Sequence, residues 1–409
     1  MNTPAAKPTA ATRLRLRITA AAENIVRSGH PWVFADSVLD SNRVGQTGEL
    51  AVIYDRKDKF LAVGLFDADS PIRVRILHVG KPQIIDANWW RINLEKSLAV
   101  RQNLCATQTN GFRLINGESD GWPALVLDKY DSTLALKIYS AIWLSRLEEI
   151  SQLIKEKIPS ERIVLRLSRN IQSLAEKQFQ LRDGQIVFGA NLNAPVIFIE
   201  NGIRFEADVL RGQKTGFFLD QRENRAEVKK LSRGKSVLNA FSFSGGFSVY
   251  AARGGAKSVT DLDISKHALE SAKRNFALNK NFPTVAACEH KTIQADAFEW
   301  IENTKEKFDL IVLDPPSLAK RESERAAAIH AYEKLNSPGI ARLNRGGILV
   351  AGSCSAHVSA TEFFDAVRRA ATKSGRKFSE LKTKLHPLDH PATFREAEYL
   401  KVIYLKFAT

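Results

Sequence analysis

The stretch SVLNAFSFSGGFS, residues 236–248, decides the fold of the largest part of this chain. It reads as an apolar strand, a turn of small residues around Gly245 and Gly246, and the start of a helix. Glycine lets a backbone approach a ligand closely, and a helix N-terminus leaves N–H groups without partners. This order predicts the first strand, turn and helix of a parallel α/β sheet, although glycine turns of this kind also occur where they serve only close packing. The dinucleotide fingerprint G-x-G-x-x-G is missing, which disfavours a nicotinamide cofactor.

The next two strands of this pattern end in acidic residues. The run VTDLDI contains Asp261 and Asp263, and the run QADAF contains Asp296 followed by Ala297 and Phe298. A carboxylate at the end of the second strand can hold both hydroxyls of a ribose, and Asp263 is the candidate because it comes later. Asp261 is assigned to solvent or capping. Asp296 is expected to accept from an adenine amino group, with Phe298 as an apolar wall. This order fits S-adenosylmethionine (SAM).

Two later loops at strand ends carry a carboxylate and a thiol. Asp314-Pro315-Pro316 follows the apolar run FDLIVL, and Cys354 follows the run GILVA in the sequence GSCS. Both groups could face one bound molecule, because the carboxyl ends of strands form the ligand crevice of an open α/β sheet. A thiol there suggests covalent catalysis. The alternative is that Cys354 is a small buried hydrophobe, as most free cysteines are.

The composition indicates a soluble protein of two or three domains. The chain has 409 residues, of which 44% are hydrophobic and 26% charged. Its three cysteines lack the spacing of a disulfide framework or a metal site, which fits a reducing cytoplasm. No signal peptide is expected in residues 1–12, and no run is long enough to span a membrane. The net charge of +15 points to a nucleic-acid partner or to a solvated basic surface.

Residues 1–80 are predicted to form a small β domain. RLRLRI at residues 13–18 alternates arginines with aliphatic residues, and the run PIRVRIL places Arg73 and Arg75 on one strand face. A hairpin is expected around the polar turn at residues 55–59. The arginines are candidates for RNA contacts, and a solvated sheet face is the alternative.

Two further domains are expected at residues 81–199 and 200–409. The first has a hairpin around residues 129–132, a helix over roughly 144–157 and a strand at 162–167, an α+β pattern. The second alternates apolar strands with amphipathic helices, as in a doubly wound parallel sheet.

The segment before the sheet, LRGQKTGFFLDQRENR, contains a second group of candidates. Asp220 and Glu223 have the spacing of a capping box. Capping leaves the aromatic pair Phe217-Phe218 unexplained, as well as Arg222 and Arg225. These residues would suit a wall against the methionine end of SAM and its carboxylate.

Together these motifs resemble the 23S rRNA 5-methylcytosine methyltransferases of the large-subunit methyltransferase I type. The resemblance covers nearly the whole chain and rests on the following motifs: SGHPWVF at 28–34, NGESDGWP at 116–123, GxxxGxxxDQR at 212–222, NxFSxxGGF at 239–247, DPP at 314–316, SCS at 353–355 and DHP at 389–391. It implies an N-terminal β-barrel PUA domain, a central α+β domain and a C-terminal Rossmann-like class I methyltransferase domain. It also implies SAM as cofactor and RNA, in particular 23S rRNA, as partner.

The expected reaction is attack of the Cys354 thiolate on C6 of cytosine, which activates C5 towards the methyl group. Asp314 would hydrogen-bond N3, and the carbonyls of Pro315 and Pro316 would accept from the exocyclic amine. The family more often has a lysine and an aromatic residue directly after the prolines, so Lys320 is the candidate to replace that lysine in part. The candidate cofactor contacts are Phe217, Asp220, Arg222, Asn239, Phe241, Ser244, Gly245, Gly246, Asp263, Asp296, Ala297 and Asp314.

Two other functions stay open. Asp-Pro-Pro also resembles the amine-binding loop of enzymes that methylate nitrogen and need no cysteine. A non-catalytic RNA-binding factor of ribosome assembly would keep the fold without binding SAM. The target nucleotide, the substrate particle, the base that removes the C5 proton and the oligomeric state, with a homodimer among the choices, are not determined by the sequence.

Overall fold

The computed structural model describes residues 13–409. The expectation that residues 1–12 hold no signal peptide therefore falls outside the described residues. The chain forms two compact units, each assembled from three segments. Among the described residues the first unit contains 13–97, 115–127 and 136–189, and the second contains 98–114, 128–135 and 190–409. The three domains expected from the sequence, with boundaries near residues 80 and 199, stay a prediction.

The first unit begins with a six-stranded sheet of order β2-β6-β5-β4-β1-β3. Its elements are β1 (Leu14–Ile18), α1 (Ala20–Arg27), β2 (Trp32–Phe34), β3 (Val38–Ser41), β4 (Leu50–Tyr54), β5 (Phe60–Phe66) and β6 (Ile72–Val79). In β1 the aliphatic side chains are buried while Arg15 and Arg17 are exposed, which confirms the predicted alternation. The hairpin predicted around residues 55–59 is confirmed by the antiparallel pairing of β4 and β5.

A five-stranded sheet of order β11-β10-β9-β8-β7 comes next along the chain. Its strands are β7 (Gly111–Asn116), β8 (Leu125–Tyr130), β9 (Thr133–Ile138), β10 (Arg162–Leu167) and β11 (Gln185–Phe188). The helices of this region are α2 (Ala87–Ala99), α3 (Gln102–Cys105), α4 (Leu147–Lys157) and α5 (Arg169–Phe179). The predicted strand at 162–167 is confirmed. The expected helix from residue 144 begins as a 3₁₀ turn and becomes α-helical at Leu147.

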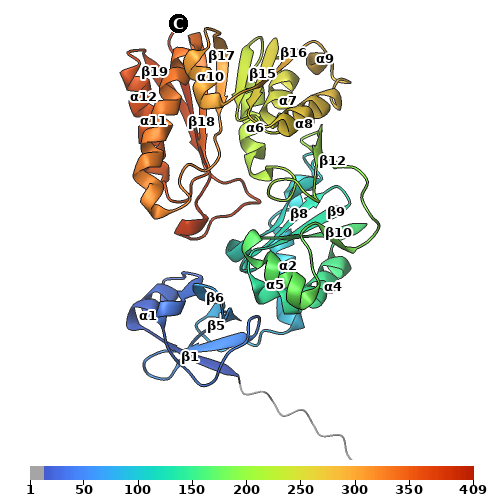
Figure 1. The fold of residues 1–409 in the computed structure, drawn as a ribbon, viewed down its shortest axis with the longest axis vertical. Helices are drawn as coiled ribbons and strands as arrows, with labels where there is room; N and C mark the ends of the chain where they lie inside the picture. The colour runs from blue at the N-terminus through green and yellow to red at the C-terminus, as the bar shows by residue number, and fades with distance from the viewer. Residues whose placement is uncertain (1–12) are drawn as a thin grey trace, which may run out of the picture. The chain divides into compact units, whose positions relative to one another are not determined.

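The second unit is built on a seven-stranded sheet of order β16-β15-β14-β17-β18-β20-β19 (Figure 1). Its strands are β14 (Ser236–Ala240), β15 (Ser258–Asp263), β16 (Glu289–Gln294), β17 (Phe308–Leu313), β18 (Leu343–Ser353), β19 (Phe378–Lys384) and β20 (Lys401–Phe407), and the hairpin β12 (Val196–Glu200) and β13 (Ile203–Ala207) precedes them. The first five strands of this sheet are parallel, and β20 is antiparallel to both of its neighbours. Because the order runs outward in both directions from β14, the predicted doubly wound α/β class is confirmed.

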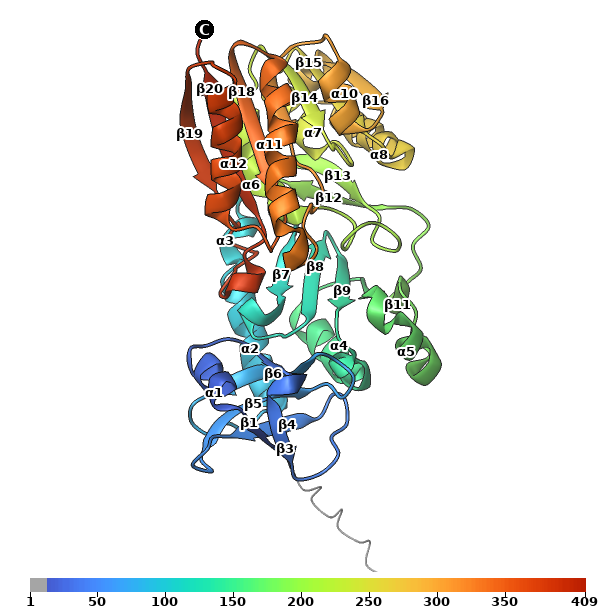
Figure 2. The same cartoon turned by 60° about the vertical axis from the view of Figure 1, so that its left-hand side comes forward.

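Helices cover both faces of this sheet (Figure 2). The helices α6 (Arg222–Leu231), α7 (Gly246–Arg253) and α8 (Lys266–Ala277) pack in sequence, as do α10 (Ala297–Asn303), α11 (Arg325–Ala341) and α12 (Ala360–Lys373), and the short α9 is Pro283–Ala286. Between the sheet and the second helix set lies a large apolar core that includes Leu238, Ile311, Leu349 and Phe363. No helix within residues 13–409 is both long and apolar enough to cross a bilayer.

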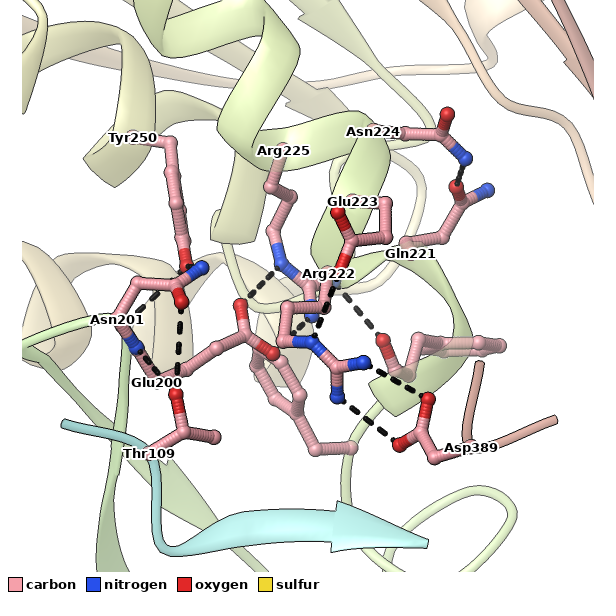
Figure 3. A network of polar contacts seen from close by, with 12 residues as sticks. Thr109, Glu200, Asn201, Gln221, Arg222, Glu223, Asn224, Arg225, Tyr250 and Asp389 are labelled. Atoms are coloured by element: carbon pink, nitrogen blue, oxygen red, sulfur yellow. Dashed lines mark hydrogen bonds and ion pairs between the residues drawn. The ribbon is translucent and has the colours of Figure 1, made fainter. Parts of the chain in front are cut away.

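Two buried ion pairs fix the start of α6 within the second unit (Figure 3). Arg222 donates to both carboxylate oxygens of Asp389 at 2.9 Å, and the N–H of Arg113 donates to the same carboxylate at 3.1 Å. Arg225 donates to both oxygens of Glu200 at 2.8 and 2.6 Å. All four side chains of the two pairs are almost fully buried. Such pairs offset the cost of desolvation only when both partners and their hydrogen bonds are present.

We expect Asp389→Ala to lower the free energy of unfolding at pH 7 by about 3–5 kcal/mol, because the Arg222 guanidinium would stay buried without its partner. Burial alone would raise the pKa of Asp389, but the charges of His390 and Arg222 hold it well below its usual range. The stabilisation is therefore present above the unfolded pKa of about 4 and is lost as the pH falls below it. Chemical denaturation at several pH values measures both effects.

The matched control is Asp365→Ala, which removes an exposed ion pair with Arg368 on α12. Its effect should stay below about 1 kcal/mol. An equal loss of unfolding free energy in the two variants would show that the buried Arg222–Asp389 pair stabilises the protein no more than an exposed pair does.

Candidate active site

A pocket of about 760 Å³ lies at the carboxyl edge of the seven-stranded sheet, entirely within the second unit. Its volume is in the range of small-molecule sites. Its wall includes these residues predicted from the sequence: Phe217, Asp220, Phe241, Ser244, Gly246, Asp263, Asp296, Ala297, Asp314, Pro315, Pro316 and Cys354. The other candidates, which are not part of the wall, are Arg222, Asn239, Gly245, Lys320, Arg73 and Arg75.

The turn between β14 and α7 is strained. Phe241 and Phe243 have φ values of 60° and 47°, which bulky side chains rarely adopt, and Gly245 has a φ of 73°. A β-carbon at Gly245 would lie 2.8 Å from the Cβ of Ala272, so both the backbone and the packing require glycine there. Strain of this kind costs about 1–3 kcal/mol per residue and gathers at ligand sites. Here it brings Phe241, Ser244 and Gly246 to the pocket.

The structure separates the two acids at the end of β15. Asp263 lines the pocket, and its carboxylate accepts from the N–H groups of Phe243 and Ser265 at 2.9 and 2.8 Å. Asp261 is fully buried instead and accepts from Asn239 Nδ2 and Ser248 Oγ. Asn239 thus belongs to the support of the strand rather than to the pocket wall.

Asp296 caps α10 and also lines the pocket. Its Oδ1 accepts from the N–H groups of Phe298 and Glu299 at 2.9 and 3.1 Å. The rings of Phe298 and Phe241 lie edge to face with centroids 5.5 Å apart, and both are part of the wall. An acceptor therefore lies beside an aromatic surface, as a flat heterocycle with an amino group would need.

Asp220 is a buried anion of the wall. Its Oδ2 accepts from Lys214 Nζ at 2.5 Å and from Tyr399 OH at 2.8 Å. Its Oδ1 has no hydrogen-bond partner among the residues that the structure describes. Burial opposes ionisation, but the Lys214 charge holds the pKa of Asp220 well below its usual range. The open oxygen is thus suited to a donor on a bound molecule.

Arg222 and Arg225, expected beside an anionic group of a ligand, have other partners. Figure 3 shows their ion pairs with Asp389 and Glu200, which occupy both guanidinium groups. Arg225 also lies over the ring of Phe217, with its guanidinium carbon 4.7 Å from the ring centroid. Each arginine thus already has a carboxylate of its own; Arg225 still lines the pocket, whereas Arg222 is not part of its wall.

Asp314 lies between the strand ends of β17 and β18. Its Oδ2 accepts from Gln221 Nε2 at 2.8 Å, and a β-carbon at Gly352 would lie only 2.7 Å from its Oδ1. Burial, and then the negative charge of Asp220, raises the pKa of Asp314 to about 7. At neutral pH this carboxyl group is therefore protonated in a large fraction of molecules and can donate a hydrogen bond.

The loop that carries Cys354 is joined to the loop that carries Asp314. Ser355 Oγ accepts from the N–H groups of Leu318 and Ala319 at 3.0 and 3.3 Å. Tyr332 OH forms hydrogen bonds with the hydroxyls of both serines that flank Cys354, at 2.7 and 2.8 Å. The thiol itself donates to Pro315 O at 3.8 Å. Burial, and then Asp314, raises the pKa of Cys354 to about 12, so the resting group is a neutral thiol.

The other substrate candidates are not among the residues that line the pocket. Lys320 is exposed, and its backbone N–H donates to Glu324. In the first unit, Arg75 is buried and donates to Glu118 at 2.7 Å, and Arg73 donates to Asp67 O at 2.9 Å. Their expected contacts with RNA stay predictions. Engagement with Glu118 makes Arg75 less suited to RNA than the exposed Arg15 of β1.

Sequence reasoning did not single out Lys214, Gln221, Tyr332 or Lys401. Lys214 and Gln221 stand inside the quoted motif between residues 212 and 222, so only their roles were missed. Tyr332 lies in helix α11, and Lys401 is the first residue of the apolar strand β20. No local sequence pattern at either position indicates a contact with the Cys354 loop. Within residues 13–409 no group of three or more His, Cys, Asp or Glu side chains is arranged to hold a metal ion.

Two family profiles match parts of this chain. The profile of S-adenosylmethionine-dependent methyltransferases matches residues 183–373, and the profile of PUA-like domains matches residues 16–78. Among solved structures, a candidate methyltransferase in complex with SAH is similar with a TM-score of 0.80 and 22% identity, covering 96% of this chain and 99% of that one. The last comparison bears on the fold alone.

Full-length relatives are closer in sequence. A protein of Deinococcus radiodurans named ribosomal RNA large subunit methyltransferase is 53% identical over 414 residues, which cover 99% of this chain and all of the relative. Ribosomal RNA large subunit methyltransferase I of Tolumonas auensis is 34% identical over 383 residues, 92% of this chain and 95% of that protein. With these relatives and the two matching profiles, the chain belongs to the SAM-dependent ribosomal RNA large subunit methyltransferases that combine a PUA-like domain with a methyltransferase domain.

Proposed function

We propose that this protein methylates C5 of a cytosine in large-subunit (23S) rRNA through a covalent adduct of Cys354 with C6. One observation carries the proposal: Cys354 and Asp314 line the same pocket at the ends of neighbouring strands. Nitrogen methylation needs an acceptor for an amine but no thiol. A thiol beside a protonated carboxyl group is what addition to the C5–C6 double bond requires.

The chemistry of the two side chains follows from their charges. The Cys354 thiolate adds to C6, and the carboxyl group of Asp314 donates to N3, where negative charge would otherwise develop. C5 then becomes nucleophilic, and bound SAM supplies the methyl group. Loss of the C5 proton restores the double bond and expels the thiolate. We assign the backbone carbonyls of Pro315 and Pro316, two residues of the pocket wall, to the exocyclic amine.

The pocket has the groups that SAM would need. We assign Asp263 to the ribose hydroxyls, Asp296 with Ala297 to the adenine, and Ser244 and Gly246 to the close approach of the backbone. The free Oδ1 of Asp220 fits the ammonium of the methionine part, and this buried unpaired oxygen is the observation that tests the fit. Phe217 and Phe241 supply apolar surface.

The substrate must bring a single base into this pocket. Cytosine inside a duplex cannot reach it, so a flexible or single-stranded segment of RNA is expected. The charge of +15 favours phosphate contacts, and the PUA-like domain is proposed to supply part of that affinity. A ribosomal substrate places the action of the protein in the cytoplasm. A homodimer stays a prediction.

Asp263→Ala is expected to weaken SAM binding by about 10- to 100-fold, because charge-assisted hydrogen bonds to the ribose contribute about 1.5–3 kcal/mol. Isothermal titration calorimetry measures the change. Glu270→Ala, which removes an exposed carboxylate from the helix that follows Asp263, should bind like the parent protein. Unchanged affinity in Asp263→Ala would remove Asp263 from the ribose site.

Cys354→Ala is expected to abolish methylation and covalent capture together. RNA with 5-fluorocytosine at the target should become trapped on the parent protein, since fluorine at C5 cannot leave as the proton does. Denaturing gel electrophoresis detects the adduct. Cys105→Ala and Cys288→Ala should both trap and methylate. Methylation that survives in Cys354→Ala would favour the nitrogen-methylating alternative, and a parent protein that binds no SAM would favour the assembly factor.

The ionisation of Cys354 and of Asp314 should set how the rate of methyl transfer depends on pH. The active form needs Cys354 ionised, with a pKa of about 12, and Asp314 protonated, with a pKa of about 7. The rate should therefore rise tenfold per pH unit below about 7 and level off above it, where gain of thiolate is balanced by loss of the Asp314 proton. Single-turnover rates between pH 5.5 and 9 test this.

In Asp314→Asn the rate should be lower by about 10²–10⁴-fold and should keep rising above pH 7, because the amide does not titrate. Asp365→Asn on α12 is the control and should keep the parent profile. A break near pH 7 that persists in Asp314→Asn would assign that titration to another group.

A further inference from the structure

Lys401 is a buried lysine directly behind the Cys354 loop. It is the first residue of β20 and lies opposite Ser353 of β18 in the antiparallel register. Its exposed fraction is 1%, whereas Lys406 on the same strand is exposed. Lysine is almost never fully buried without a partner, so its position needs a physical reason.

The partners of the Lys401 ammonium are neutral. Nζ donates to the carbonyl oxygen of Ser355 at 2.7 Å and to that of Val358. Within residues 13–409 no carboxylate lies within 4.0 Å of Nζ, and Glu398 and Glu362 act on it only from farther away. Burial lowers the pKa of Lys401 to about 8, which still leaves it charged at neutral pH. A buried cation of this kind lacks an anion.

The thiol of Cys354 needs a nearby positive charge in order to ionise. The charged groups that act on it are Asp314 and Asp220, which oppose its ionisation, and Lys214 and Lys401, which favour it. Lys214 already forms an ion pair with Asp220 at 2.5 Å. Lys401 is therefore the cation near the thiol that has no carboxylate partner of its own among the described residues, and it holds the residue next to Cys354.

We propose that Lys401 is a positioning residue that stabilises the thiolate of Cys354: it holds the loop through two hydrogen bonds and supplies the positive charge that the thiolate needs. This inference rests on the proposed role of Cys354 as the nucleophile. A purely structural lysine would need only its N–H donors. A lysine that stabilises the thiolate needs its charge, and this difference can be tested with variants.

The test measures the thiol directly, in the full chain and without RNA or SAM. In a Cys105→Ser, Cys288→Ala background Cys354 is the only thiol. The rate of its alkylation by iodoacetamide between pH 7 and 10 follows the thiolate fraction. Lys401→Gln keeps donors but removes the charge, and Lys401→Arg keeps the charge. Lys406→Gln is the control on the same strand, and Tyr332→Phe removes hydrogen bonds to the same loop without removing a charge.

We expect Lys401→Gln to alkylate about tenfold more slowly than the parent at pH 8, which corresponds to a rise of about one unit in the pKa of the thiol. Lys406→Gln and Tyr332→Phe should alkylate at the parent rate, and Lys401→Arg should match the parent near pH 7, where both side chains are charged. Thermal unfolding checks that each variant is folded. A folded Lys401→Gln that alkylates at the parent rate at every pH would overturn the proposal.

If Lys401→Gln does not fold, Lys401→Arg decides, because arginine stays charged above pH 8, where Lys401 loses its proton. Faster alkylation than the parent between pH 8 and 10 supports the role of the charge, and a rate equal to or below that of the parent contradicts it. A different result would show that the proposed role of Cys354 as the nucleophile is wrong. Methylation by Cys354→Ala would refute the nucleophile whatever the alkylation shows, whereas an inactive Cys354→Ala beside an unshifted Lys401→Gln would refute Lys401 alone.

Discussion

The parallel pairing of β14, β17 and β18 is the constraint on which the site depends. In the register, Ala240 lies beside Leu313, and Leu313 beside Ala351, so the three strands end at nearly the same level. The strained turn, the Asp-Pro-Pro loop and the Cys354 loop therefore emerge at one edge. Side chains alternate between the faces of a strand, so a slip of one residue in β18 would reverse the direction of every side chain that leads to the loop. The core around Ile311 and Leu349 prevents such a slip.

Burial makes the chemistry of this edge unusual. It raises the pKa of both Asp314 and Cys354, so the resting protein keeps a protonated carboxyl group beside a protonated thiol. A neutral thiol is a poor nucleophile and a poor target for oxidants, because thiolates carry that reactivity. Cys354 is therefore largely unreactive in the resting protein. The same burial keeps the thiolate fraction low, and in our proposal the charge of Lys401 raises that fraction.

Local patterns were enough to predict much of the fold and part of the site. The alternation in β1, the strand–turn–helix at residues 236–248 and the class of the sheet depend on neighbours in sequence, and the structure confirms them. The choice of Asp263 over Asp261 matches the pocket wall because position along a strand decides which side chain reaches the edge. Arg222 could not be read in this way, since its partner Asp389 stands far along the chain and only folding brings them together. The same holds for Lys401, whose contacts are with the backbone of a loop.

The tripeptide Asp220-Gln221-Arg222 shows how one short motif serves three purposes. Asp220 faces the pocket with one oxygen unpaired, Gln221 donates to Asp314, and Arg222 turns away to its buried pair with Asp389. Helix α6 starts at Arg222, so the ion pair anchors the point where the 3₁₀ turn of the other two residues joins the helix. Moving that anchor would move both Asp220, which raises the pKa of Asp314, and Gln221, which orients it. The buried arginine thus acts on the chemistry through its neighbours in the chain, although it lies outside the wall of the pocket.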